Sequence, residues 1–154
     1  MPTSQKPKSP KLPLTHAERT QLRRAKLRLT DIEKQSPEPF SSLLGISVER
    51  ARELIALAAF QTIPSIGPKL AEDLVRLGYY SLDELRGRDG AELIDTLELI
   101  YGCQIDPCVE DQIRCVIHHA DYPDSQKQWW EFTEERKSFR AQHGYPPTRP
   151  ASGN

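Results

Sequence analysis

The stretch Ile63-Pro64-Ser65-Ile66-Gly67-Pro68-Lys69-Leu70-Ala71 decides how the centre of this chain folds. It reads as a tight turn that opens directly into a helix. Gly67 allows the backbone to approach a ligand closely or to take a positive φ, and Pro68 suits the first helical position, where no N–H bond is needed. The unpaired N–H groups and the positive dipole end of the helix favour an anion, and Lys69 adds a cation. We therefore expect this first hairpin, residues 63–71, to bind phosphate.

Helical periodicity dominates the rest of the chain, and no strand pattern or Asn-Gly hairpin interrupts it. A first helix is expected from a cap at Thr15 to about Glu33, where Ser36-Pro37-Glu38-Pro39 ends it. Further helices are expected over residues 48–61, 68–77, 90–101, 107–120 and 133–143, with a short connector at 81–85 and a tryptophan segment near 129. The fold class is therefore all-α.

A weak internal repeat connects two of the turns. Ile66-Gly67-Pro68 is echoed by Ile105-Asp106-Pro107, and each lies between two predicted helices. In this second hairpin, residues 102–109, Asp106 stands where the first has Gly67. A carboxylate there satisfies the helix N-terminus and repels phosphate. We expect the first hairpin to bind and the second to be structural.

The first hairpin resembles the helix-hairpin-helix motif of proteins that grip the DNA backbone. Ser65 stands where that motif usually has its first glycine. Two such units joined by a short helix resemble tandem helix-hairpin-helix domains. This resemblance implies a compact tandem bundle, with an extra N-terminal helix and a C-terminal helical segment.

A wider resemblance covers about residues 40–140. The first hairpin, the run Asp106-Pro107-Cys108-Val109 and the segment Trp130-Glu131-Phe132-Thr133 are similar to small bacterial helix-hairpin-helix proteins named for pathogenicity loci or mitomycin resistance. The resemblance implies a bacterial, DNA-associated role.

Charge is distributed unevenly along the chain. Residues 1–30 hold eight basic residues and one acidic residue, so their net charge is +7, which leaves −8 for the remainder of a chain whose total is −1. Such a basic segment suits nucleic acid or another polyanion. The alternative is a solvated helix that neutralises the acidic body. The candidate basic arm consists of Arg19, Arg23, Arg24, Lys26 and Arg28.

Proline residues cluster near both ends, which predicts disordered tails. The resulting division is a disordered basic tail at 1–14, a basic amphipathic helix at 15–35, a tandem helix-hairpin-helix-like domain at 40–121, an aromatic helical segment at 122–143 and a disordered tail at 144–154.

The cysteines raise the question of a metal. Cys103, Cys108, Cys115 and His119 include the ligand types that zinc prefers. Their spacing does not match paired C-x-x-C knuckles, and cysteine is commonly a buried apolar residue. We expect no metal and no other cofactor, and a lowered thiol pKa for Cys108 at its helix start.

Trp129 and Trp130 have two interpretations. They stack on an unpaired base, or they clamp the C-terminal segment onto the core, as adjacent aromatic residues more often do; one tryptophan in each role is a third arrangement. In the first interpretation, phosphates would be held by Lys127, Arg136, Lys137 and Arg140.

Catalytic signatures are missing from the sequence. It has no phosphate loop, no Gly-x-Ser-x-Gly elbow and no His-Glu-x-x-His helix. Its longest apolar run, residues 54–60, is too short for a membrane span, and no signal peptide is recognisable. A cytoplasmic protein with reduced thiols and no membrane partner is expected.

These observations predict a non-enzymatic, largely sequence-independent DNA-binding protein that grips duplex or single-stranded DNA. The alternative is an adaptor that uses the same fold to bind a protein partner. The predicted DNA-binding residues are Ser65, Ile66, Gly67, Pro68, Lys69 and Arg76.

Overall fold

A computed structural model describes residues 8–152 of the chain, and they form an all-helical structure without strands. The all-α prediction is confirmed. The elements are α1 (His16–Arg24), η1 (Leu29–Lys34), α2 (Pro37–Leu44), α3 (Val48–Phe60), α4 (Pro68–Arg76), η2 (Asp83–Leu85), α5 (Gly90–Tyr101), α6 (Pro107–Asp121), η3 (Trp129–Phe132) and α7 (Thr133–His143), where η marks a short 3-10 helix.

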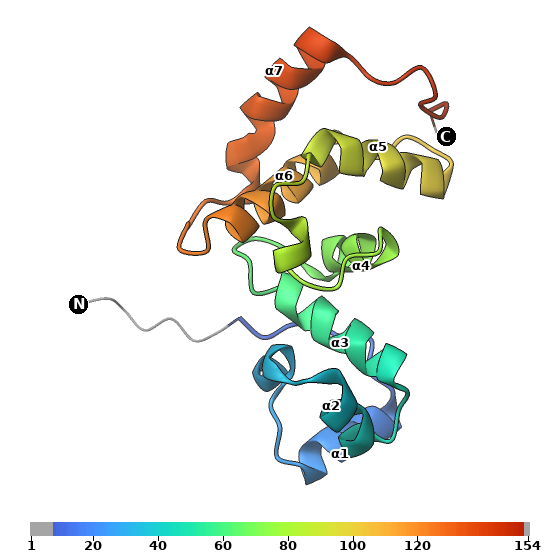
Figure 1. The fold of residues 1–154 in the computed structure, drawn as a ribbon, viewed down its shortest axis with the longest axis vertical. Coiled ribbons are helices and arrows are strands. Elements are labelled where there is room, and N and C mark those ends of the chain that lie inside the picture. The colour runs from blue at the N-terminus through green and yellow to red at the C-terminus, as the bar shows by residue number, and fades with distance from the viewer. Residues whose placement is uncertain (1–7, 153–154) are drawn as a thin grey trace, which may run out of the picture.

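The helices are stacked along the long axis of the molecule (Figure 1). At one end α2 and η1 pack against α3 and α1 packs against α2, α4 lies in the middle, and the pair α5 and α6 leads to α7 at the other end. One continuous apolar cluster connects these layers, from Phe40 in α2 through Phe60 and Leu74 to Ile113 in α6. The two interhelical turns that sequence singled out therefore belong to one packed body.

Short polar residues or glycine stand at several of the helix ends. Ser47 accepts a hydrogen bond from Arg50 N–H at the start of α3. After α4, Gly78 has φ +96°, and the N–H groups of Gly78 and Tyr79 bond the carbonyls of Val75 and Leu74. This pair of hydrogen bonds is the Schellman motif. Glycine stabilises it because glycine adopts a positive φ without a Cβ clash.

The first predicted helix is interrupted. Its capping box at Thr15 is present, but α1 ends at Arg24 and Lys26 takes a left-handed φ of 57°. The Leu27 N–H then bonds the Leu22 carbonyl and closes the helix. Leu22 in α1 and Ile32 in η1 are both buried. Two short helices therefore bury these side chains without one continuous helix.

The stretch Ser36-Pro37-Glu38-Pro39 starts a helix that the sequence analysis does not predict. Pro37 is the first residue of α2, where its missing N–H costs nothing. Phe40 and Leu44 from α2 are buried against α3. The prolines thus end one segment and begin the next.

The predicted tails, residues 1–14 and 144–154, have tertiary contacts in the parts that the structure describes. Residues 1–7 and 153–154 lie outside the described residues. Residues 8–14 run along α3, where the Gln61 side chain bonds both the N–H and the carbonyl of Lys11 at 2.9 Å, and Leu12 is buried. At the other end, Arg149 pairs with buried Glu98 at 2.9 Å. Tertiary hydrogen bonds order these segments in spite of their proline content.

No helix within residues 8–152 is both long enough and apolar enough to cross a membrane.

Candidate nucleic-acid interface

Ser65 gives the first hairpin its shape. It has a left-handed φ of 64° at the position where a glycine is usual. Its hydroxyl accepts a hydrogen bond from Trp129 N–H at 3.0 Å and donates one to the Pro64 carbonyl. The left-handed conformation costs a non-glycine residue about 1 kcal/mol. A hydrogen bond contributes a similar free energy and offsets this cost. Serine therefore keeps the backbone conformation that glycine would take.

The N-terminus of α4 is open. Gly67 is the N-cap with an extended backbone, φ −103° and ψ −174°, so the positive φ that glycine would allow is not used. No side chain caps this helix in residues 8–152, and the first bonded amide is Ala71 N–H, to the Gly67 carbonyl. A Cβ added at Gly67 would meet no heavy atom within 4 Å. Lys69 is exposed, and its N–H group has no partner within residues 8–152, so this group is available to an anion.

Lys8 is a cation at this hairpin that sequence reasoning missed. Its ammonium donates a hydrogen bond to the carbonyl of Ile66, and burial lowers its pKa. The contact joins residues 58 positions apart. It exists because Gln61 holds Lys11 against the end of α3, and no local pattern signals such a pairing. Lys69 is exposed on the other side of the turn.

Arg76 lies away from the hairpin turn. It is the last residue of α4, seven positions after Lys69, which is about 10 Å along the helix axis. Its guanidinium lies 5.2 Å from the centre of the Tyr101 ring. The structure therefore separates Arg76 from the other predicted contacts, which remain together.

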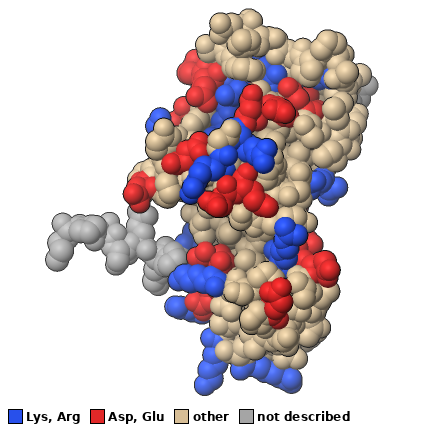
Figure 2. All heavy atoms as spheres, viewed as in Figure 1, with Lys and Arg blue, Asp and Glu red and all other residues tan. Residues whose placement is uncertain are grey.

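The basic arm lies mainly at the opposite end of α3. Arg50, near the start of α3, holds buried Glu18 of α1 at 3.1 Å, whereas the first hairpin follows the end of this 13-residue helix, about 20 Å away. Figure 2 shows basic side chains gathered at the α1 end of the molecule. A groove of about 600 Å³ has Lys8, Arg28 and Lys34 in its lining, together with the acidic residues Asp31 and Glu33.

The second hairpin is closed. Asp106 is the N-cap of α6, and its carboxylate accepts a hydrogen bond from Cys108 N–H at 2.8 Å. This backbone hydrogen bond lowers the pKa of Asp106, so the group is anionic at neutral pH. The turn is also held from inside, where buried Glu98 accepts from Ile105 N–H at 2.8 Å.

The candidate ligands Cys103, Cys108, Cys115 and His119 do not gather into one cluster. No group of three or more candidate ligands gathers in the described residues. Cys115 and His119 both bond the Lys127 carbonyl, and burial raises the pKa of Cys115 to about 12. The lowered pKa expected for Cys108 is wrong: hydrogen bonding to the Asp106 carboxylate raises it, because that negative charge opposes thiolate formation.

The two tryptophans have different environments. Trp129 is half-buried against the core and fixed to Ser65, whereas Trp130 is 56% exposed and meets the Trp129 ring edge to face. The segment thus lies beside the first hairpin. Base stacking by Trp130 stays a prediction.

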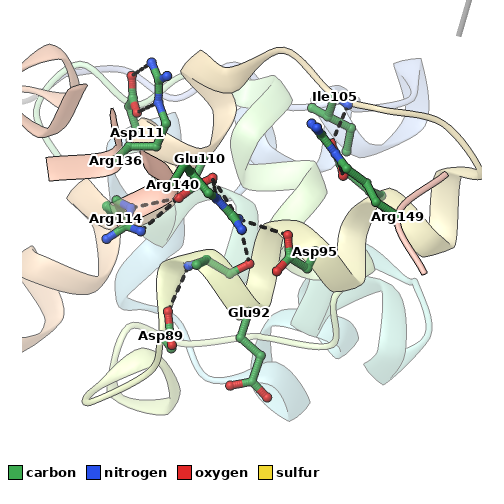
Figure 3. A network of polar contacts seen from close by, with 12 residues as sticks. Asp89, Glu92, Asp95, Ile105, Glu110, Asp111, Arg114, Arg136, Arg140 and Arg149 are labelled. Atoms are coloured by element: carbon green, nitrogen blue, oxygen red, sulfur yellow. Dashed lines mark hydrogen bonds and ion pairs between the residues drawn. The ribbon is translucent and has the colours of Figure 1, made fainter. Parts of the chain in front are cut away.

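Arg136 and Arg140, the two arginines expected to hold phosphates near the tryptophans, are already paired. Arg136 binds Asp111, which is fully buried, at 2.8 Å, and Arg140 bridges Glu110 and Asp95 at 3.0 and 2.9 Å. Figure 3 shows these side chains converging between α5, α6 and α7. Because α7 buries no residue of its own, these ion pairs attach it to the body.

Comparison with known proteins points to one family. The family model described as "Cdd1: Pathogenicity locus" matches residues 53–138. A "Mitomycin resistance protein McrB" from Streptomyces lavendulae is 30% identical over 84 residues, which are 54% of this chain and 79% of that protein. No solved structure matches the chain. The matched region includes both hairpins and the tryptophan segment.

Proposed function

This chain belongs to the pathogenicity-locus family, and we propose that it is a non-enzymatic protein that binds DNA largely independently of base sequence. The observation that carries the proposal is the open N-terminus of α4, with Lys8 and Lys69 beside it. A free N–H group and two ammonium groups around one partly exposed turn favour a phosphate oxygen.

The contact would be made with the DNA backbone. Phosphates carry no sequence information, so binding through them is independent of base sequence. This binding weakens at higher salt, because salt cations compete with the protein for the phosphates. Only the first hairpin offers such a site, because Asp106 occupies the second. Affinity would therefore be modest, with help from Arg28 and Lys34 in the groove that Lys8 also lines.

The biological setting follows from the relative's name. We connect this DNA binding to mitomycin resistance or to DNA damage, because the Streptomyces lavendulae relative is named a mitomycin resistance protein. Neither family name describes catalysis. A cytoplasmic location stays a prediction of the sequence.

Titration of labelled duplex and single-stranded DNA at two salt concentrations tests the proposal. We expect affinity to fall with salt and to fall at least tenfold in the double variant Gly67→Asp with Lys69→Glu, since a capping carboxylate and a reversed charge oppose phosphate. The control is Arg88→Glu with Thr96→Asp, two exposed positions outside every predicted DNA contact, which changes net charge equally. Equal affinities of the two double variants would reject the first hairpin as the DNA-binding site.

The second candidate function is a protein adaptor. Leu99, Ile100 and Tyr101 are 56%, 49% and 42% exposed at the end of α5, directly before the second hairpin. Adjacent exposed apolar side chains are typical of interaction surfaces. Two results together would favour this function. The protein would show no measurable DNA binding at low salt, and the substitutions Leu99→Ser and Ile100→Ser would abolish binding of a protein partner.

A further inference from the structure

A cavity of about 690 Å³ adjoins the first hairpin. It lies between residues 62–65, the η2 region and the segment 123–128 after α6. In Figure 1 that segment runs beside the turn between α3 and α4, and the bond from Trp129 N–H to Ser65 fixes this neighbourhood. Pockets for small organic ligands have volumes of about 300–1,000 Å³.

The lining combines apolar walls with two cations. Ile63, Pro64 and Leu82 supply apolar surface, Lys8 and Arg86 supply positive charge, and Asp83 supplies one negative charge. Lys8 also touches the Ile66 carbonyl, so one ammonium group borders both the cavity and the first hairpin. Arg86 pairs with exposed Asp83 at 3.1 Å, a contact at the surface that an anion can replace.

Polar groups in the lining can recognise a ring with donors and acceptors. His119 is buried, and its Nε2 lies 2.8 Å from the Lys127 carbonyl. A carbonyl accepts only, so Nε2 donates in this contact. Gln126 and Gln128 add amide groups that both donate and accept.

We propose that this cavity binds a nucleotide, with the base between the apolar walls and the phosphate at Lys8 and Arg86. The inference rests on the proposed function, since the nucleotide is an unpaired residue of a DNA strand whose backbone lies on the first hairpin. A free mononucleotide presents the same chemistry and is the second source.

An unpaired nucleotide fits the cavity better than a paired one. In a duplex the base is stacked and its hydrogen-bonding edge is occupied, so it must leave the helix to enter a protein pocket. The cost is least where a base is already unpaired or mismatched. The cavity therefore confers a preference for DNA structure and none for extended sequence.

The preference is measured as the ratio of dissociation constants for a fully paired duplex and for the same duplex with one unpaired thymidine. For the wild-type protein we expect the unpaired nucleotide to tighten binding about tenfold, as one set of base contacts provides. Arg86→Glu should bring the ratio near one. Arg88→Glu is the matched control, because this exposed arginine does not line the cavity.

Calorimetric titration with thymidine monophosphate distinguishes the two sources. Saturable binding of the mononucleotide that Arg86→Glu removes, without a preference for the unpaired duplex, assigns the cavity to a free nucleotide. A paired-to-unpaired ratio near one in the wild type, together with no mononucleotide binding, overturns the inference. The proposed function is tested separately. It fails if the double variant at residues 67 and 69 binds duplex DNA with the same affinity as its control.

Discussion

The first hairpin places Gly67 at the N-terminus of α4, and the second places Asp106 at the same point of α6. Each cap is followed by proline at the first helical position. Gly67 leaves the Lys69 N–H group open, whereas the Asp106 carboxylate fills its own helix end. Among the described residues, two similar turns therefore lead into one helix without a side-chain cap and one helix capped by a carboxylate.

The two hairpins also differ in what holds them. The first is held by the bond from Trp129 N–H to Ser65, by the bond from Lys8 to the Ile66 carbonyl and by burial of Ile63 and Ile66 in the core. Glu98 ties the second through Ile105 N–H and through Arg149 of the C-terminal segment. The hairpin proposed to bind is held by apolar burial and two hydrogen bonds, whereas the second hairpin is held by a buried charge.

Removing Glu98 should have the largest effect on this difference. We expect Glu98→Ala to lower the free energy of unfolding by about 3 kcal/mol, because it leaves Arg149 and Ile105 N–H without their partner. Chemical denaturation measures the loss. Glu92→Ala, an exposed position on the same helix, is the control, and equal losses in both variants would contradict a buried anchor.

Closing the first hairpin is the next test. Gly67→Asp alone should lower DNA affinity about tenfold, because it reproduces the cap of the second hairpin and repels phosphate. The extended backbone at Gly67 accepts an aspartate, so the stability should be unchanged or slightly higher. A loss of DNA binding accompanied by unfolding would mean that the variant damages the fold instead of closing a site.

Two substitutions at Ser65 separate backbone strain from hydrogen bonding. Ser65→Ala keeps the left-handed strain and loses the bond to Trp129 N–H, so it should cost about 1 kcal/mol of unfolding free energy. Ser65→Gly loses the same bond but relieves the strain, and should lie within about 0.5 kcal/mol of wild type. Equal thermal midpoints for the two variants would refute this division.

The smallest effect concerns Asp106 and pH. Its pKa is below the ordinary 3.8, so its charge stabilises the folded state above the unfolded pKa, and this contribution is lost as pH falls through the folded value. Asp106→Ala should cost about 1 kcal/mol at neutral pH. The difference should shrink as pH falls below 3.8; a constant difference down to the acid transition would exclude a charged cap.

Local signals predicted most helix boundaries. Ser47, Asp89 and Gly102 act within one turn of their own position, so their roles can be read from neighbouring residues. The break at Lys26 and the start of α2 at Pro37 were missed. Both depend on packing of Leu22 and Phe40 against other elements, which local periodicity does not contain.

The candidate site was predicted only in part. The hairpin residues 65–69 were identified from their order in the chain, but Arg76 and most of the basic arm lie elsewhere. The prediction did not include Lys8, because its place at the hairpin depends on a hydrogen bond to Ile66, which lies 58 residues away in the chain. Arg136 and Arg140 were assigned to phosphates, although buried acids on α5 and α6 already bind them.

The sequence by itself determined the helical class, the caps and the inequality of the two hairpins, because each depends on the backbone preferences of adjacent residues. The tertiary structure alone decided which charges are free. It brought Lys8 to the open turn, joined Ser65 to the tryptophan segment and formed the cavity beside them. Ion pairing and cavity shape arise from residues far apart in the chain, so only packing determines them.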